Sequence, residues 1–187
     1  MTRETHKICV LDTNVIYPIE IRDLLFWFAH DDLYIPKWSK HIFDEWVDVM
    51  NRKHVNAEEI RKRINMVSMA FPEAMVENYE FLISRLKLPD PKDCHVLAAA
   101  IQSNSNIIVT NNLKDFPEKY ISNFGIVVKS ADNFLSELIE EYPAETLNSF
   151  IKLVSNRRNP NLNNNQVIEA LEYNRLSKTA KNLLSLL

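Results

Sequence analysis

Three aspartates that are far apart in the sequence stand where buried strands are predicted to end or a helix to begin. Asp12 follows the apolar run 7–11, Asp115 follows the run 107–110, and Asp93 opens an alanine-rich segment. Because ligands of parallel sheets bind just beyond the carboxyl ends of strands, these carboxylates can converge on one sheet edge. Converging carboxylates cannot all stay ionised without cations between them. Such oxygen ligands suit Mg²⁺ or Mn²⁺, and the matching chemistry is attack of water on a phosphodiester.

Asp93 carries the most specific signal of the three. Asp90 precedes Pro91, which is the arrangement expected for an N-cap followed by the first helical position, so capping is its expected role. Asp93 then falls in line with Val96 and Leu97, on the buried side of the predicted helix. A carboxylate in that position needs compensation. The helix N-terminus supplies about 0.3–1 kcal/mol, which is the simpler alternative, and a metal ion would supply more.

The other acidic residues have structural alternatives, which are of equal weight for Asp12 and stronger for Asp115 and Glu45. Asp12 can serve as a loop or cap residue that leads into the next helix. Asp115, close to Pro117, can be a turn residue or a helix cap. Glu45 lies away from the apolar stripe of its helix, so periodicity predicts a solvated side chain there, with Asp44 and Asp48 equally plausible as site residues.

Short apolar runs alternate with helical patterns along the first part of the chain. Helices are expected after Pro18, after a cap at Ser39, and over residues 56–71, 73–86 and 92–102, whereas strands are expected at residues 7–11, 33–35 (closed by Pro36), 107–110 and 125–128. The strands show no polar alternation, as expected when both faces of a sheet are covered. This order predicts an α/β fold with a mostly parallel central sheet flanked by helices.

The pattern changes to helices alone after about residue 131. A polar break at 159–165 separates these helices, and the last one is expected to begin at Ser177. We therefore expect a domain over residues 1–143 and a helical C-terminal extension over 144–187. The apolar faces of that extension must be covered by the core, a second copy or a partner.

Composition excludes several classes of function. A single glycine in 187 residues rules out glycine-rich phosphate loops, and a net charge of −3 argues against a protein that coats nucleic acid. Cys9 and Cys94 are predicted to be buried thiols without a disulfide or zinc site. Residues 1–7 lack the apolar stretch of a signal peptide, and no run is long enough to span a membrane, so a reducing cytoplasm is the expected compartment.

Four segments, in order, resemble the motifs of PIN domains. Residues 8–15 resemble the opening strand with its Asp-Thr-Asn motif, and residues 39–45 resemble the helix that bears an acidic glutamate. Residues 90–100 resemble the third motif, and residues 108–116 resemble the last one, Thr-x-Asn/Asp followed by Asp-Phe. The similarity extends over about residues 7–130 and implies a three-layer PIN-like fold.

The resemblance also implies an activity and a set of residues. It implies a Mg²⁺- or Mn²⁺-dependent endoribonuclease, most similar to VapC-like toxins of bacterial toxin–antitoxin pairs, with an antitoxin partner and a homodimer. By matching position, the acidic quartet would be Asp12, Glu45, Asp93 and Asp115, with Asp12, Asp93 and Asp115 as metal ligands and Asn14, Thr110 and Asn112 in support. Asn112 competes with Asp115 for the place next to the metal, and Asp90 competes with Asp93.

Basic and aromatic residues near the motifs are candidates for contact with RNA. Lys37, Lys92 and Lys114 could hold phosphates, although a solvated surface charge is the more common role for any single one of them. Tryptophans at helical spacing are more often core residues than platforms for bases.

Two alternatives compete with a nuclease. A phosphatase of the haloacid dehalogenase type also begins with an aspartate at a strand end, but it needs a second aspartate where this chain has Asn14. A PIN scaffold that has lost catalysis could serve as an RNA- or protein-binding module, and the complete acidic set argues against that alternative.

Overall fold

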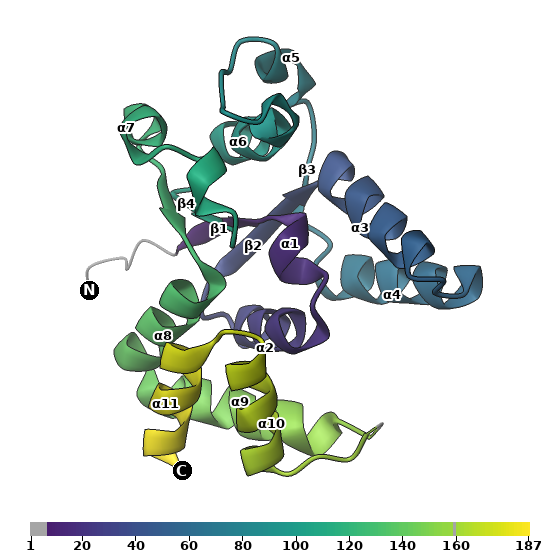
Figure 1. Ribbon diagram of the computed structural model, residues 1–187, viewed down its shortest axis with the longest axis vertical. Helices are drawn as coiled ribbons and strands as arrows, with labels where there is room; N and C mark the ends of the chain where they lie inside the picture. The colour runs from purple at the N-terminus through teal and green to yellow at the C-terminus, as the bar shows by residue number, and fades with distance from the viewer. Residues whose placement is uncertain (1–6, 159) are drawn as a thin grey trace.

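A parallel five-stranded sheet forms the centre of the protein (Figure 1). The computed structural model describes residues 7–158 and 160–187, so residues 1–6 and Asn159, which is part of the predicted polar break, lie outside the described residues. The strands run in the order β3-β2-β1-β4-β5, with bounds β1 Ile8–Leu11, β2 Ile35–Ser39, β3 Met75–Val76, β4 Ile107–Val109 and β5 Val127–Lys129. The predicted α/β fold with a parallel sheet is thus confirmed.

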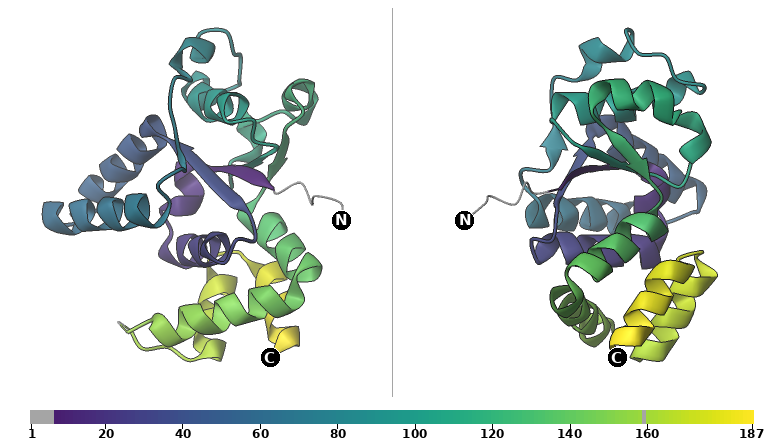
Figure 2. Two further views of the ribbon diagram at one scale, coloured as in Figure 1. Left: turned by 180° about the vertical axis from the view of Figure 1, so that it is seen from behind. Right: turned by 90° about the vertical axis from the view of Figure 1, so that its left-hand side faces the viewer.

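Helices cover both faces of this sheet, which explains why its central strands are apolar throughout. Helix α6 (Cys94–Gln102) lies on one side, and α1 (Thr13–Ile16), α2 (Ile19–His30) and α8 (Ala131–Glu141) lie on the other (Figures 1 and 2). Helices α3 (Lys40–Arg52) and α4 (Ala57–Ala70) extend beyond the β2–β3 side. The Ser39 hydroxyl accepts a hydrogen bond from the Ile42 backbone at 3.3 Å and caps α3, as predicted.

The second strand is displaced from its predicted position. It was expected at residues 33–35 with Pro36 as its end, but β2 spans Ile35–Ser39 and contains Pro36. The Ile35 amide donates to Lys7 on the β1 side, whereas the Trp38 amide donates to Ala74 on the β3 side. The backbone nitrogen of Pro36, like that of Trp38, faces the β3 side of the strand, at a level where β3 has not yet begun. The missing N–H of Pro36 therefore costs no hydrogen bond.

The helix predicted over residues 73–86 is also wrong. This segment holds the strand β3, a turn in which Asn78 has a φ of 58°, and the single-turn helix α5 (Glu80–Ile83). Strand β3 pairs with β2 through Trp38–Met75 and Ser39–Val76. Backbone N–H and C=O groups of β2 would lack hydrogen-bond partners without β3, and their pairing with β3 outweighs the helical preference of this segment.

The remaining elements follow their predictions closely. The strand expected at 125–128 is β5, displaced by two residues, because Gly125, with a φ of 70°, instead ends a short 3₁₀ turn at Ser122–Phe124. This turn follows the single-turn helix α7 (Glu118–Ile121), and two more 3₁₀ turns lie at Pro91–Asp93 and Leu113–Asp115. Cys9 and Cys94 are buried free thiols, as predicted.

The C-terminal helices form a further layer next to α2 and α8 (Figure 1). They are α9 (Pro143–Asn156), α10 (Asn164–Tyr173) and α11 (Ser177–Leu186). Asp31, just after α2, accepts a hydrogen bond from Ser149 and pairs with Lys152 on α9. The carboxylate of Asp132 on α8 accepts from the first free amides of α11 at 2.9 and 3.1 Å. The core of the same chain therefore covers much of the extension, while the boundary at residue 144 stays a prediction.

No helix within the described ranges is long and apolar enough to cross a membrane.

Candidate active site

The site lies where the strand order changes direction, between β1 and β4. Strand β1 leads to β2 on one side, while its other neighbour, β4, comes much later in the chain. Leu11 pairs with Val109, and the Asp12 amide donates to the Val109 carbonyl at 3.1 Å. The residues that follow these two strands, Asp12 and Thr110, are therefore neighbours. Such switch points are where open α/β sheets bind ligands.

Asp12 is buried and held by three donors. Its Oδ1 accepts from the Thr13 amide at 2.7 Å, and its Oδ2 accepts from Asn14 at 2.5 Å and from the Thr110 hydroxyl at 2.7 Å. Burial, with only 6% of the residue exposed, raises the pKa of Asp12, and these hydrogen bonds partly oppose that rise. The carboxylate is fixed in orientation but carries a charge that its surroundings only partly offset.

The predicted supporting residues Asn14 and Thr110 form one network with Asp12. Asn14 Nδ2 also donates to the Thr110 hydroxyl at 2.9 Å, and Asn14 Oδ1 accepts from the Asn111 amide at 2.8 Å. The Thr110 hydroxyl accepts from the Asn112 amide at 3.1 Å. Helix α1 and the loop after β4 are thus tied together around one carboxylate.

Glu45 points to the same place, although helical periodicity predicted a solvated side chain. Its Oε2 lies 2.6 Å from the Thr13 hydroxyl, and its Oε1 lies 3.0 Å from Nε2 of His95. Partial burial opposes ionisation, but these two hydrogen bonds hold the pKa of Glu45 below its usual value. Its side chain is 45% exposed, so the predicted contact with solvent is present, but the wheel describes α3 alone and does not show the partners of Glu45 on α1 and α6.

His95 is the buried partner of Glu45. Only 6% of this residue is exposed, and Nδ1 is buried without a hydrogen-bond partner among the described residues. Its ring stacks on His41 with centroids 5.3 Å apart, and His41 Nδ1 lies 2.5 Å from the Tyr79 hydroxyl. Because an ionised carboxylate only accepts hydrogen bonds, the His95 proton belongs on Nε2.

Asp93 faces this group from the start of α6 and lacks compensation of its own. Its Oδ2 is buried and has no hydrogen-bond partner within the described chain. Burial, together with the nearby charges of Asp12, Asp90 and Asp115, raises the pKa of Asp93 to about 6. Asp90 itself accepts from the Lys92 amide at 2.9 Å, which confirms its predicted role as a cap.

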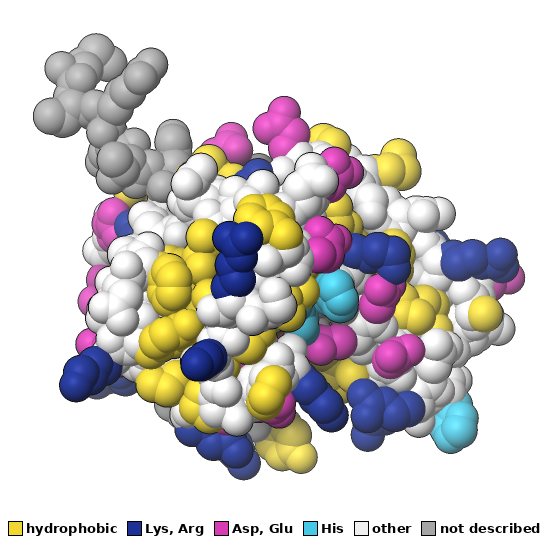
Figure 3. Space-filling model, turned by 90° about the horizontal axis from the view of Figure 1, so that it is seen from above, with side chains coloured by type: hydrophobic (Ala, Val, Ile, Leu, Met, Phe, Trp, Pro, Cys, Tyr) yellow, Lys and Arg dark blue, Asp and Glu magenta, His cyan; other side chains and the backbone are white. Residues whose placement is uncertain are grey.

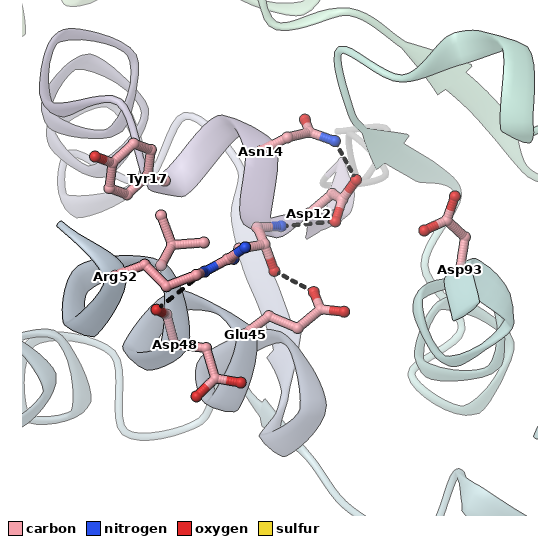
Figure 4. Close-up of a pocket in the computed structure, with 9 residues that line it drawn as sticks. Asp12, Asn14, Tyr17, Glu45, Asp48, Arg52 and Asp93 are labelled. Atoms are coloured by element: carbon pink, nitrogen blue, oxygen red, sulfur yellow. Dashed lines mark hydrogen bonds between the residues drawn. The ribbon is translucent and has the colours of Figure 1, made fainter. Parts of the chain in front are cut away.

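Asp12, Glu45 and Asp93 line one open pocket of about 450 Å³ (Figure 4). They come from the end of β1, from α3 and from the start of α6. The pocket is also lined by Thr13, Asn14, Tyr17, Asp48, Val49 and Arg52. Figure 3 shows acidic and histidine side chains gathered near the middle of one face, with lysines and arginines around them.

Other predicted residues lie outside the pocket lining. Asp115 accepts a hydrogen bond from the Asn112 side chain, so the two competing residues of the last motif bind each other. The charge of Asp115 still raises the pKa of Asp93. Lys92 and Lys114 are exposed beside Asp93 and Asp115. Lys37 is turned away and donates to the Glu73 carbonyl at 2.7 Å. The roles of these residues stay predictions.

Sequence reasoning missed Thr13, His95, Tyr17 and Arg52, and it named Asp48 only as an alternative to Glu45. Asp48 and Arg52 follow Glu45 by three and seven positions, which places all three on one side of α3, so the spacing could have identified them once Glu45 was chosen. A histidine in an alanine-rich buried helix was a further signal, because such a group needs a polar partner. Trp38 and Trp46 are each 1% exposed, as expected for core residues.

The residues of the pocket fit a divalent cation that is bound only in part by protein. The donors are carboxylate oxygens, and the unpartnered Asp93 Oδ2 near Asp12 is a site of uncompensated negative charge. Within residues 7–158 and 160–187, no three His, Cys, Asp or Glu side chains are close enough to hold a metal ion by themselves. Mg²⁺ does not need such a set, since it often uses one or two carboxylates together with waters and substrate phosphates.

Comparison with known proteins gives three results. The pattern that defines the PIN domain matches residues 9–114, and the pattern of the VapC50 C-terminal domain matches residues 131–185. A protein of Mycobacterium tuberculosis (strain ATCC 25618 / H37Rv) named "Putative ribonuclease VapC50" is 32% identical over 80 residues. These residues are 43% of this chain and 47% of that protein, so the chain spans about half the length of the relative. No solved structure matches.

The repulsion around Asp93 predicts that Asp93→Asn stabilises the metal-free protein at pH 7.5. In the folded protein the pKa of Asp93 is about 6, above its ordinary 3.8, so the ionised carboxylate weakens the fold above pH 6. We expect the thermal midpoint to rise by about 2 °C, and the gain to vanish as the pH falls from 6 to 4. Thermal unfolding in chelator measures both effects. Glu172→Gln, which removes an exposed carboxylate on α10, is the control, and an unchanged or lower midpoint for Asp93→Asn at pH 7.5 would contradict the prediction.

Proposed function

Because this chain belongs to the PIN domain family, we propose that it is an endoribonuclease that depends on Mg²⁺ or Mn²⁺ and cuts RNA phosphodiester bonds. The observation that carries the proposal is the convergence of Asp12, Glu45 and Asp93 in one open pocket at the switch point of the sheet. The ribonuclease name of the mycobacterial relative supports the same class of substrate.

Asp12 and Asp93 are the residues that we expect to hold the cation, with Asp115 contributing charge from nearby. When bound, a divalent cation supplies charge neutralisation and activation of water for attack on a phosphodiester. Asn14 and Thr110 keep the Asp12 carboxylate in one orientation. Glu45, ionised and held by Thr13 and His95, is placed to accept a proton at Oε1 or Oε2.

A catalytically silent PIN scaffold is the other candidate function. A scaffold that only binds RNA or protein has no need for a carboxylate such as Asp93, whose buried Oδ2 lacks a hydrogen-bond partner among the described residues and whose raised pKa shows that its charge weakens the fold. The cost of keeping Asp93 ionised therefore favours an enzyme.

Replacement of Asp12 by asparagine should abolish RNA cleavage while preserving the fold. Asparagine keeps an acceptor for the Thr13 amide and removes the charge that attracts the cation. Its Nδ2 replaces the oxygen that accepts from Asn14 and Thr110, so the fold of the variant is checked by circular dichroism and thermal unfolding. We expect wild-type protein to cleave RNA with Mg²⁺ or Mn²⁺ and not with chelator, and Asp12→Asn to show only background cleavage. Asp90→Asn makes the same chemical change at a helix cap that asparagine also serves, and it should retain most activity. Equal activity of wild type and Asp12→Asn would refute the nuclease.

His95 should affect cleavage through the orientation of Glu45. His95→Gln can keep an N–H donor near the position of Nε2, whereas His95→Leu fills the space without a donor. We expect His95→Leu to lower kcat by about 10–100-fold, as is typical when a residue that orients a site residue is lost. A purely structural role would impair both variants alike, so substantial recovery of kcat in His95→Gln is the result that distinguishes positioning from packing.

We further propose that the chain is the toxin of a toxin–antitoxin pair and acts as a homodimer. The match of residues 131–185 to a VapC50 domain supports this assignment. Expression of wild-type protein should arrest growth, expression of Asp12→Asn should not, and coexpression of a small protein encoded in the adjacent reading frame should relieve the arrest. Arrest that persists with both flanking reading frames coexpressed would argue against such a partner.

A further inference from the structure

The wall of the pocket opposite Asp93 has a different character from the rest of the site. Tyr17, at the end of α1, and Arg52, on α3, lie on this wall (Figure 4). Arg52 is the one basic residue among the lining residues, whereas Asp12, Glu45, Asp48 and Asp93 are acidic. The acidic part of the pocket repels an RNA phosphate, so a cationic group at its border is where a substrate phosphate would be held.

Arg52 is available for such a contact. Its Nε donates to the backbone carbonyl of Asp48, one turn back on the same helix, at 3.3 Å. Among the described residues Arg52 forms no ion pair with an acidic side chain, although Asp48 lines the same pocket. Arg52 is exposed and lines the pocket, and the bond at Nε does not involve the two terminal nitrogens. The planar geometry of those nitrogens matches two oxygens of a phosphate.

Tyr17 adds an aromatic surface next to this cation. The residue is half-buried and lines the pocket on the same wall as Arg52. Bases of single-stranded RNA stack on aromatic side chains with little dependence on sequence. A pocket of about 450 Å³ that is open on one side has room for part of one nucleotide.

We propose that Arg52 and Tyr17 form a nucleotide subsite for single-stranded RNA, with a phosphate on the Arg52 guanidinium and a base against Tyr17. The proposal rests on the function proposed above. It places the RNA strand next to the scissile bond on the side of the pocket formed by Arg52 and Tyr17. It places substrate binding at the end of α1 and on α3. Of the lysines predicted from the sequence, Lys37 lies on β2, and Lys92 and Lys114 lie in the 3₁₀ turns before α6 and after β4.

The test measures RNA binding separately from cleavage. In the Asp12→Asn background, a fluorescent uridine oligoribonucleotide is titrated across a range of salt concentrations. Arg52→Gln should weaken binding about tenfold and lower the slope of log Kd against log salt by about 0.7, the value for one lost phosphate contact on a single strand. Arg52→Lys keeps the charge and should keep the slope, but bind several-fold more weakly because it lacks the planar fork. Arg61→Gln, an exposed arginine on α4 outside the pocket, is the matched control.

Tyr17 is tested by two variants that preserve bulk. Tyr17→Phe should bind RNA like the parent, whereas Tyr17→Leu should bind about tenfold more weakly through loss of stacking. With wild-type Asp12 restored, Arg52→Gln should raise KM more than it lowers kcat.

Two outcomes would overturn the subsite. One is an Arg52→Gln protein with the affinity and salt slope of Arg61→Gln. The other is an Arg52→Gln protein that binds Mn²⁺ more tightly while its RNA affinity is unchanged, which would make Arg52 an internal neutraliser of the acidic residues. If the wild-type protein fails to cleave RNA but Arg52→Gln still loses RNA binding, the proposed nuclease activity is refuted and the proposed nucleotide subsite is retained.

Discussion

The buried carboxylate of Asp12 is the constraint around which the site is organised. A charged group in this position weakens the fold unless donors surround it, and Thr13, Asn14 and Thr110 supply them. Those donors come from α1 and from the loop after β4, which meet only because β1 and β4 are neighbours in register. The hydrogen bonds that stabilise Asp12 therefore also join two parts of the chain nearly 100 residues apart.

Different compensation around each carboxylate separates the acidic residues by role. Glu45 is ionised readily because His95 and Thr13 donate to it, whereas Asp93 has an oxygen with no partner and a raised pKa. A group that is well satisfied by the protein suits proton transfer or orientation. A group left with uncompensated charge suits a cation or substrate that arrives later. The arrangement thus combines a rigid part and a receptive part within one pocket.

The C-terminal helices stabilise the scaffold from the side away from the pocket lining. Their polar contacts include those to Asp31 and Glu20, at the ends of α2, and to Asp132 on α8. Helix α2 in turn packs beneath the sheet that carries Asp12 (Figure 1). The extension therefore supports the layer below the site without supplying any residue that lines the pocket.

Local chemistry was sufficient to predict β1, the capped helix α3, the Asp90 cap and the aspartates at the carboxyl ends of strands, because each depends on neighbours within a few residues. The identity of Glu45 as a site residue came only through family resemblance, since periodicity pointed to solvent. Tertiary structure alone decided the strand β3, the place of Pro36 inside β2 and the partners of Glu45. Those features depend on backbone groups and side chains brought together by strand and helix packing, and no local pattern in the chain records which distant partner will satisfy them.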